Sequence, residues 1–236
     1  MRKSIVNRTA FLVLIAVALV LLAAASPAKA DPIYTTSGTP PVFGGDSLSL
    51  WSGGTFGEAL GEAFVPTETA TLTDAIVPLG IAEDFGSAGD LVTVYIESST
   101  AAGAPSGTVL DTLTTTTAIT STAADITFTC ATPTSCSLPT LSAGTTYDIV
   151  VQQTAGPDML GWNLVSPTES ATTYSSIGGP AGPFDTNTGS DLAAFEIDGT
   201  STATPEPSSL ILLGAGLLGL VVFGRKRFVG DGLAQS

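Results

Sequence analysis

Short runs of alternating apolar and polar residues are the main pattern of this chain, and they predict β-strands. In residues 91–97, Val92, Val94 and Ile96 share one face, and residues 146–152 repeat the pattern. Ala193, Phe195 and Ile197 do the same before an Asp-Gly turn. Enrichment in β-branched and aromatic residues adds strands at 57–65, 69–79, 108–114, 125–130 and 159–165. No window has a sustained helical period with caps.

Clusters of Gly, Pro, Asp and Ser separate these runs, as turns do. The clearest clusters are residues 85–90, 103–107, 142–144, 155–158 and 178–183. About eight short strands joined by such turns predict an all-β fold, an antiparallel β-sandwich of jelly-roll type. An immunoglobulin-like sandwich is the near alternative, because the sequence does not fix the strand order. Residues 114–122, rich in Thr and Ser, are expected to form a loop or an edge strand.

Two longer apolar segments flank this region. Basic residues at Arg2, Lys3 and Arg8 precede the apolar residues 10–25, and Ala28-Lys29-Ala30 is a small-x-small cleavage site. Residues 1–30 are therefore predicted to be a signal peptide cut between Ala30 and Asp31. Near the other end, residues 208–224 are uncharged and are predicted to form a transmembrane helix. The basic stop Arg225-Lys226-Arg227 predicts a cytoplasmic C-terminus.

The resulting organisation is a signal peptide (1–30), an exported domain (31–203) and a C-terminal tail (204–236). All seven Lys and Arg residues lie in the two ends, and the chain has no His. The domain is consequently more negative than the whole chain, whose formal charge is −14. Such a surface repels phosphate backbones, so no nucleic-acid partner is expected.

The lack of basic side chains also limits the chemistry of the domain. A Ser-His-Asp triad, a Cys-His pair or a Ser-Lys dyad cannot be assembled without His or Lys, and phosphate binding of the Walker type is excluded too. Carboxylate chemistry of the glycosidase kind remains, but nothing in the sequence pairs two particular carboxylates. The chain is therefore predicted not to be an enzyme.

Cys130 and Cys136 are the only cysteines and lie close together. In an exported protein they are expected to form one local disulfide worth on the order of 2 kcal/mol. A metal pair is the alternative, although no His or further Cys is present to complete a zinc site.

The sequence suggests two kinds of binding site in the domain. Asp84 and Asp90 lie in Gly-rich turns that could present oxygens to calcium, although solvated turn acids are the favoured reading; no other cofactor is expected. Trp51 and Trp162 could stack on sugars, although an aromatic residue in a sandwich more often belongs to the core.

The tail carries a family resemblance. Pro205-Glu206-Pro207, a Leu/Gly/Ala-rich segment and Arg225-Lys226-Arg227 follow one another near the C-terminus. Together they resemble the PEP-CTERM sorting domain of Gram-negative bacteria. The resemblance implies processing by an exosortase near residues 205–207, in a bacterium that makes exopolysaccharide. Nine residues follow the basic cluster, more than such tails usually have.

The domain itself resembles the choice-of-anchor type domains found ahead of such tails. The resemblance rests on Phe43-Gly44-Gly45-Asp46 and on residues 62–66, 71–75 and 103–110. It implies a β-rich fold and adds little on function.

These observations together predict a non-enzymatic protein that passes through the inner membrane to the cell surface or extracellular matrix. Signal peptidase and an exosortase would process it, the tail would contact the membrane, and polysaccharide is the expected neighbour. A carbohydrate-binding module on the cell surface is the alternative.

Overall fold

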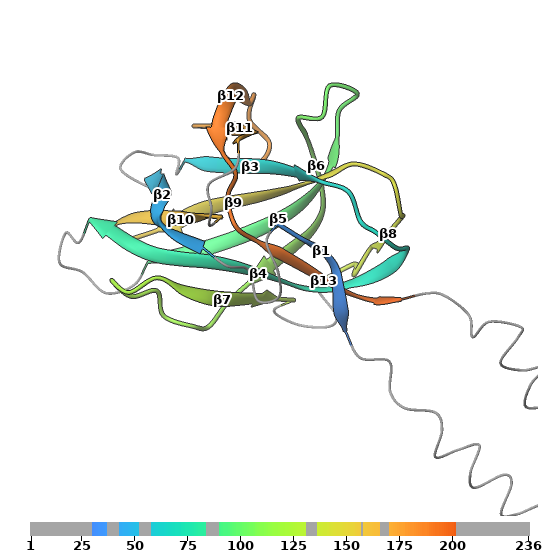
Figure 1. Ribbon diagram of the computed structural model, residues 1–236, viewed down its shortest axis with the longest axis horizontal. Coiled ribbons are helices and arrows are strands. Elements are labelled where there is room, and N and C mark those ends of the chain that lie inside the picture. The colour runs from blue at the N-terminus through green and yellow to red at the C-terminus, as the bar shows by residue number, and fades with distance from the viewer. Residues whose placement is uncertain are drawn as a thin grey trace, which may run out of the picture.

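The computed structural model describes residues 30–36, 43–51, 58–83, 90–130, 136–156, 158–165 and 170–201, without the side chains of residues 43–46, 51 and 83. The described residues contain no helix and thirteen strands (Figure 1). The strands are β1 Asp31–Thr35, β2 Phe43–Trp51, β3 Ala59–Phe64, β4 Ala70–Glu83, β5 Leu91–Ser99, β6 Pro105–Thr114, β7 Ala124–Thr129, β8 Thr140–Leu141, β9 Tyr147–Ala155, β10 Met159–Val165, β11 Ser170–Ser176, β12 Asp185–Asp191 and β13 Glu196–Ser201.

All pairings are antiparallel and connect the strands into one sheet in the order β1-β13-β4-β7-β6-β5-β9-β3-β11-β12. The long strand β4 also pairs with β8 and β10, and β10 pairs with β2. β6 and β7 are joined by a single register pair, Thr114 with Thr129. The sheet therefore consists of two well-paired portions that meet at a narrow joint.

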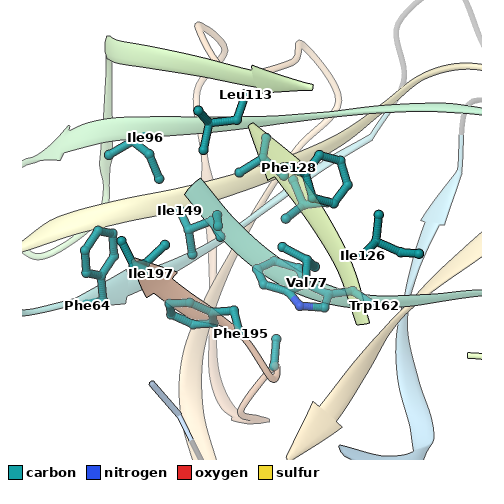
Figure 2. Packing of buried hydrophobic residues seen from close by; sticks show 14 of the residues in the cluster. Phe64, Val77, Ile96, Leu113, Ile126, Phe128, Ile149, Trp162, Phe195 and Ile197 are labelled. Carbon is teal, nitrogen blue, oxygen red and sulfur yellow. The ribbon is translucent and has the colours of Figure 1, made fainter. Parts of the chain in front are cut away.

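Both portions contribute to one hydrophobic core. The alternating residues Val92, Val94 and Ile96 of β5 are buried in it, as the sequence pattern requires. Figure 2 shows how the large side chains converge, among them Phe64, Phe128 and Trp162. Aromatic rings pack on one another here, with the centroids of Trp162 and Phe195 6.1 Å apart.

The predicted all-β, antiparallel class is confirmed, but the predicted number of about eight strands is too low. Seven predicted strands overlap their observed counterparts closely, and the eighth begins later, at Glu196. The prediction missed β1, β2, β8, β11 and β12. Most of these lack an apolar alternation: β12 reads Asp-Thr-Asn-Thr-Gly-Ser-Asp and is largely exposed, and β8 has two residues. Residues 115–123 form a loop, one of the two predicted outcomes.

The described strands run from Asp31 to Ser201, within the predicted exported domain. The predicted signal helix and the predicted transmembrane helix at 208–224 lie outside the described residues. Among the residues that are described, no helix is long and apolar enough to cross a membrane.

Candidate functional site

A pocket of about 310 Å³ opens at one end of the sheet. Its walls come from the end of β4, the start of β5 and the loop after β6. That loop is fixed against β4 by a hydrogen bond of 2.9 Å from the Ile81 amide to the Thr120 carbonyl. The lining residues are Ile81, Asp90, Leu91, Val92, Thr115, Thr116, Thr117, Ala118, Ile119 and Asp158.

The polar end of this pocket is formed by Asp90 and Asp158. The Asp90 Oδ1 atom accepts hydrogen bonds from the Gln153 side-chain amide (2.9 Å) and from the Asp158 amide (3.3 Å). Gln153 is fully buried and also donates to the Asp158 carbonyl at 2.8 Å. Burial raises the pKa of Asp90, and a hydrogen bond with the Asp158 carboxyl raises it further. These hydrogen bonds hold Asp90, Gln153 and Asp158 together at this end of the pocket.

The arrangement of Asp90 and Asp158 bears on the expected chemistry. Glycosidases hold their two carboxyl groups roughly 5 Å or more apart, so that the sugar and a nucleophile fit between them. In this pocket the backbone amide of Asp158 donates to the Asp90 carboxylate at 3.3 Å, which holds the two residues side by side.

Of the two residues in the predicted calcium site, the structure describes Asp90, whereas Asp84 lies outside the described residues. The described residues contain no group of three or more His, Cys, Asp or Glu side chains arranged to hold a metal ion. Calcium at Asp84 and Asp90 stays a prediction.

The two tryptophans proposed for sugar binding have different outcomes. Trp162 on β10 is fully buried, and its indole N–H donates to the Ala194 carbonyl at 2.9 Å. A ring without exposed surface cannot stack on a sugar, so Trp162 belongs to the core and the suggestion of a binding role was wrong. Trp51 ends β2, and its side chain is outside the described part.

The predicted disulfide between Cys130 and Cys136 is confirmed, with the two Cα atoms 5.9 Å apart. It closes a short loop between the end of β7 and the segment that leads to β8.

The sorting and processing residues lie mostly outside the described part of the chain. These are Ala28, Pro205-Glu206-Pro207 and Arg225-Lys226-Arg227. The predicted cleavage point between Ala30 and Asp31 coincides with the start of β1. Cleavage there would leave the strand intact.

A set of buried carboxyl groups was not predicted from the sequence. Glu62 points from β3 into the core, where its Oε1 accepts a hydrogen bond from the Ala193 amide at 3.3 Å. Burial raises the pKa of Glu62 to about 8, although the hydrogen bond from Ala193 lowers the pKa in part. Glu97 and Asp148 are also fully buried, and burial raises the pKa of each to about 7.

Glu97 and Asp148 were missed because the alternation rule placed them on the solvent side. Each follows a core residue by one position, which puts its side chain on the opposite face. That outer face is covered by the turn between β5 and β6 and by residues 177–184. A Cβ atom added to Gly107 would lie 3.6 Å from Cα of Ala181, and one added to Gly179 would lie 2.9 Å from Nε2 of Gln152, so these segments lie close to that face. Glycines and prolines concentrated at 103–107 and 178–183 were the available signal.

The class of protein that these features define is an exported, acidic, all-β protein. Residues 203–227 match the PEP-CTERM protein-sorting motif, which confirms the resemblance read from the tail. No curated protein and no solved structure matches the chain. The motif implies export, sorting to the cell surface and processing by an exosortase. The match covers the tail only, and the choice-of-anchor resemblance of the domain stays a prediction.

Proposed function

We propose that this chain is a non-enzymatic protein of the cell surface or extracellular matrix of a Gram-negative bacterium, associated with exopolysaccharide. In this account, signal peptidase removes residues 1–30 and the tail holds an intermediate in the inner membrane. An exosortase then acts near Pro205-Glu206-Pro207. The observation that carries the proposal is the PEP-CTERM match at residues 203–227.

The composition of the domain supports a non-catalytic role. Between Asp31 and Gly224 the sequence has no Lys, Arg or His. Ser-His and Cys-His pairs and Ser-Lys dyads need one of these side chains, which leaves carboxylates as the available catalytic groups. An acidic domain rich in Thr and Ser instead suits a hydrated structural module.

We also infer that the domain is a two-layer sandwich of jelly-roll type. The single β6–β7 register pair supports a fold of the sheet at that joint. Core residues from β5 and β9 in one portion and from β4, β7 and β13 in the other form one cluster, as expected for two facing layers.

The sorting proposal is tested by replacing Pro205, Glu206 and Pro207 with alanine in the host bacterium. The variant is expected to keep its tail and to accumulate in the membrane fraction, because the enzyme loses its recognition sequence. Ser201→Ala with Thr202→Ala, just upstream of the matched residues, is the control and should be processed normally. An unchanged mature size and location of the alanine variant would contradict the proposal.

The pocket favours a second candidate function, carbohydrate binding. Two carboxyl groups and the hydroxyl-bearing residues Thr115 to Thr117 surround an apolar floor, a mixture suited to a sugar's hydroxyl groups and C–H faces. Its volume is at the small end for ligand pockets, which suits about one sugar ring.

A glycan array probed with the whole exported protein tests this second function. A retained glycan should lose at least about tenfold in affinity (1.4 kcal/mol) in Asp158→Asn, because a hydrogen-bond acceptor in the pocket is lost. Asp185→Asn, on the exposed strand β12, should bind normally. Binding to no glycan, or equal binding by Asp158→Asn, would remove the candidate.

A further inference from the structure

Two fully buried carboxyl groups lie directly opposite each other on neighbouring strands. Glu97 of β5 is paired with Asp148 of β9, so both side chains leave the same face of the sheet. Both residues have no exposed surface. Burial raises the pKa of Asp148, and the charge of the neighbouring Glu97 raises it further, in keeping with this pairing.

Each carboxyl group uses only one of its two oxygens. Glu97 Oε2 accepts a hydrogen bond from the Gly107 amide at 2.8 Å, and Asp148 Oδ2 accepts one from the Ser99 hydroxyl. The other oxygens, Glu97 Oε1 and Asp148 Oδ1, are buried and have no hydrogen-bond partner. A buried acceptor without a partner is costly, and an ionised one far more so.

The domain cannot neutralise this pair by itself. No Lys, Arg or His occurs between Asp31 and Gly224. The titratable neighbours are Tyr95 on β5, Tyr174 on β11 and Glu62 on β3, so no neighbour supplies positive charge. When Glu97 and Asp148 are ionised, their counter-ion has to come from the medium.

We propose that Glu97 and Asp148 bind a divalent cation, Ca²⁺ in preference to Mg²⁺, with the Ser99 hydroxyl as a third oxygen. Carboxylate and hydroxyl oxygens are hard ligands, which Ca²⁺ accepts in irregular arrangements. Mg²⁺ keeps several of its waters and demands octahedral geometry, and a site without solvent exposure suits it poorly.

The affinity of this site is expected to be modest. Calcium affinity rises with the number of charged ligands, and this site has two. A dissociation constant on the order of 10⁻⁴ to 10⁻³ M, as in extracellular calcium modules, is expected. Because the site is closed, the ion would enter as the domain folds or opens locally, so binding appears as added stability.

Thermal unfolding of the whole exported protein at pH 8 tests the proposal. Adding 10 mM CaCl₂ to chelator-treated protein should raise the melting temperature by about 5 °C, and MgCl₂ should raise it less. Glu97→Gln and Asp148→Asn should each abolish the calcium shift. The matched control is Asp111→Asn, a buried carboxyl whose two oxygens accept the Thr112 and Leu138 amides; it should keep the shift.

Terbium luminescence provides a second readout that needs no variant to fold. Tb³⁺ replaces Ca²⁺ in oxygen sites, and Tyr174, which interacts with Asp148, can sensitise it. Tyrosine-excited emission that Ca²⁺ displaces supports the proposal. Absence of a calcium shift in the wild type, or an equal shift in Glu97→Gln and Asp148→Asn, would overturn it. If both variants are more stable than the wild type and the wild type shows no calcium shift, the pair holds a proton instead of a cation.

Discussion

Individual carboxyl groups account for the most unusual property of this domain. Glu62, Glu97 and Asp148 are buried, and all three have pKa values raised by burial to about 8, 7 and 7. Burial also raises the pKa of Asp198 to about 7, helped by its neighbours Asp74 and Glu196. Acids that are ion-paired or hydrogen-bonded in their charged form have lowered pKa values and stabilise the folded protein at neutral pH. Here the shift has the opposite sign.

The raised pKa values predict that the domain loses stability as the pH rises. The folded protein keeps protons that the unfolded chain releases above pH of about 4.5, so stability falls from there until the folded groups ionise near pH 7 to 8. Each pKa unit corresponds to about 1.4 kcal/mol, so a total loss on the order of a few kcal/mol is expected.

Urea unfolding in the presence of chelator, followed by the fluorescence of the buried Trp162, measures this effect. The free energy of unfolding should be larger at pH 5 than at pH 8.5, and Glu62→Gln should flatten the difference. Stability that stays level or rises between these two pH values would contradict the assignment of these groups as buried acids.

At the scale of elements, the outer face of β3, β5 and β9 depends on close packing of the turn between β5 and β6. Gly61 on β3 illustrates this: a Cβ atom at that position would lie 2.9 Å from Cγ of Pro105. Pro105 is buried at the start of β6. The same packing covers Glu97 and Asp148.

Gly61→Ala is therefore expected to destabilise the protein by about 1–3 kcal/mol, because the added methyl group overpacks the contact with Pro105. Pro105→Ala in the same chain should recover part of that loss, because it removes the opposing atom. A double-mutant cycle by urea denaturation measures the coupling. Strict additivity of the two changes would show that Gly61 and Pro105 do not meet.

Some elements could be predicted from sequence because their two faces differ. The alternation in β5 and β9 places Val94 and Ile149 in the core, and both are fully buried. The same rule failed for Glu97 and Asp148 because a turn and a loop distant in sequence cover the second face. β12 was not predicted because its sequence contains no apolar residue that could show an alternating pattern.

The candidate sites were harder to predict, since they depend on pairings across long stretches of chain. Asp90 could be selected from its Gly-rich turn, but its contact with Asp158 joins residues 68 positions apart. Cys130 and Cys136 were predictable because they are neighbours in sequence. Trp162 could not be assigned to a face from its polar neighbours.

In the whole molecule, the acidic domain and the predicted export and sorting signals occupy separate parts of the chain. The basic residues occupy the two ends, and the acidic domain lies between them. The PEP-CTERM motif at 203–227 begins two residues after β13 ends at Ser201. Removal of both ends would release a domain with no basic side chain, whose buried acids then depend on protons or metal ions from the surroundings.

The most direct test of the sorting account is the intact mass of the exported protein purified from its host. The account predicts a chain that starts at Asp31 and ends near Pro205-Glu206-Pro207, apart from any group attached during processing. A mature protein that retains Arg225-Lys226-Arg227 would contradict it.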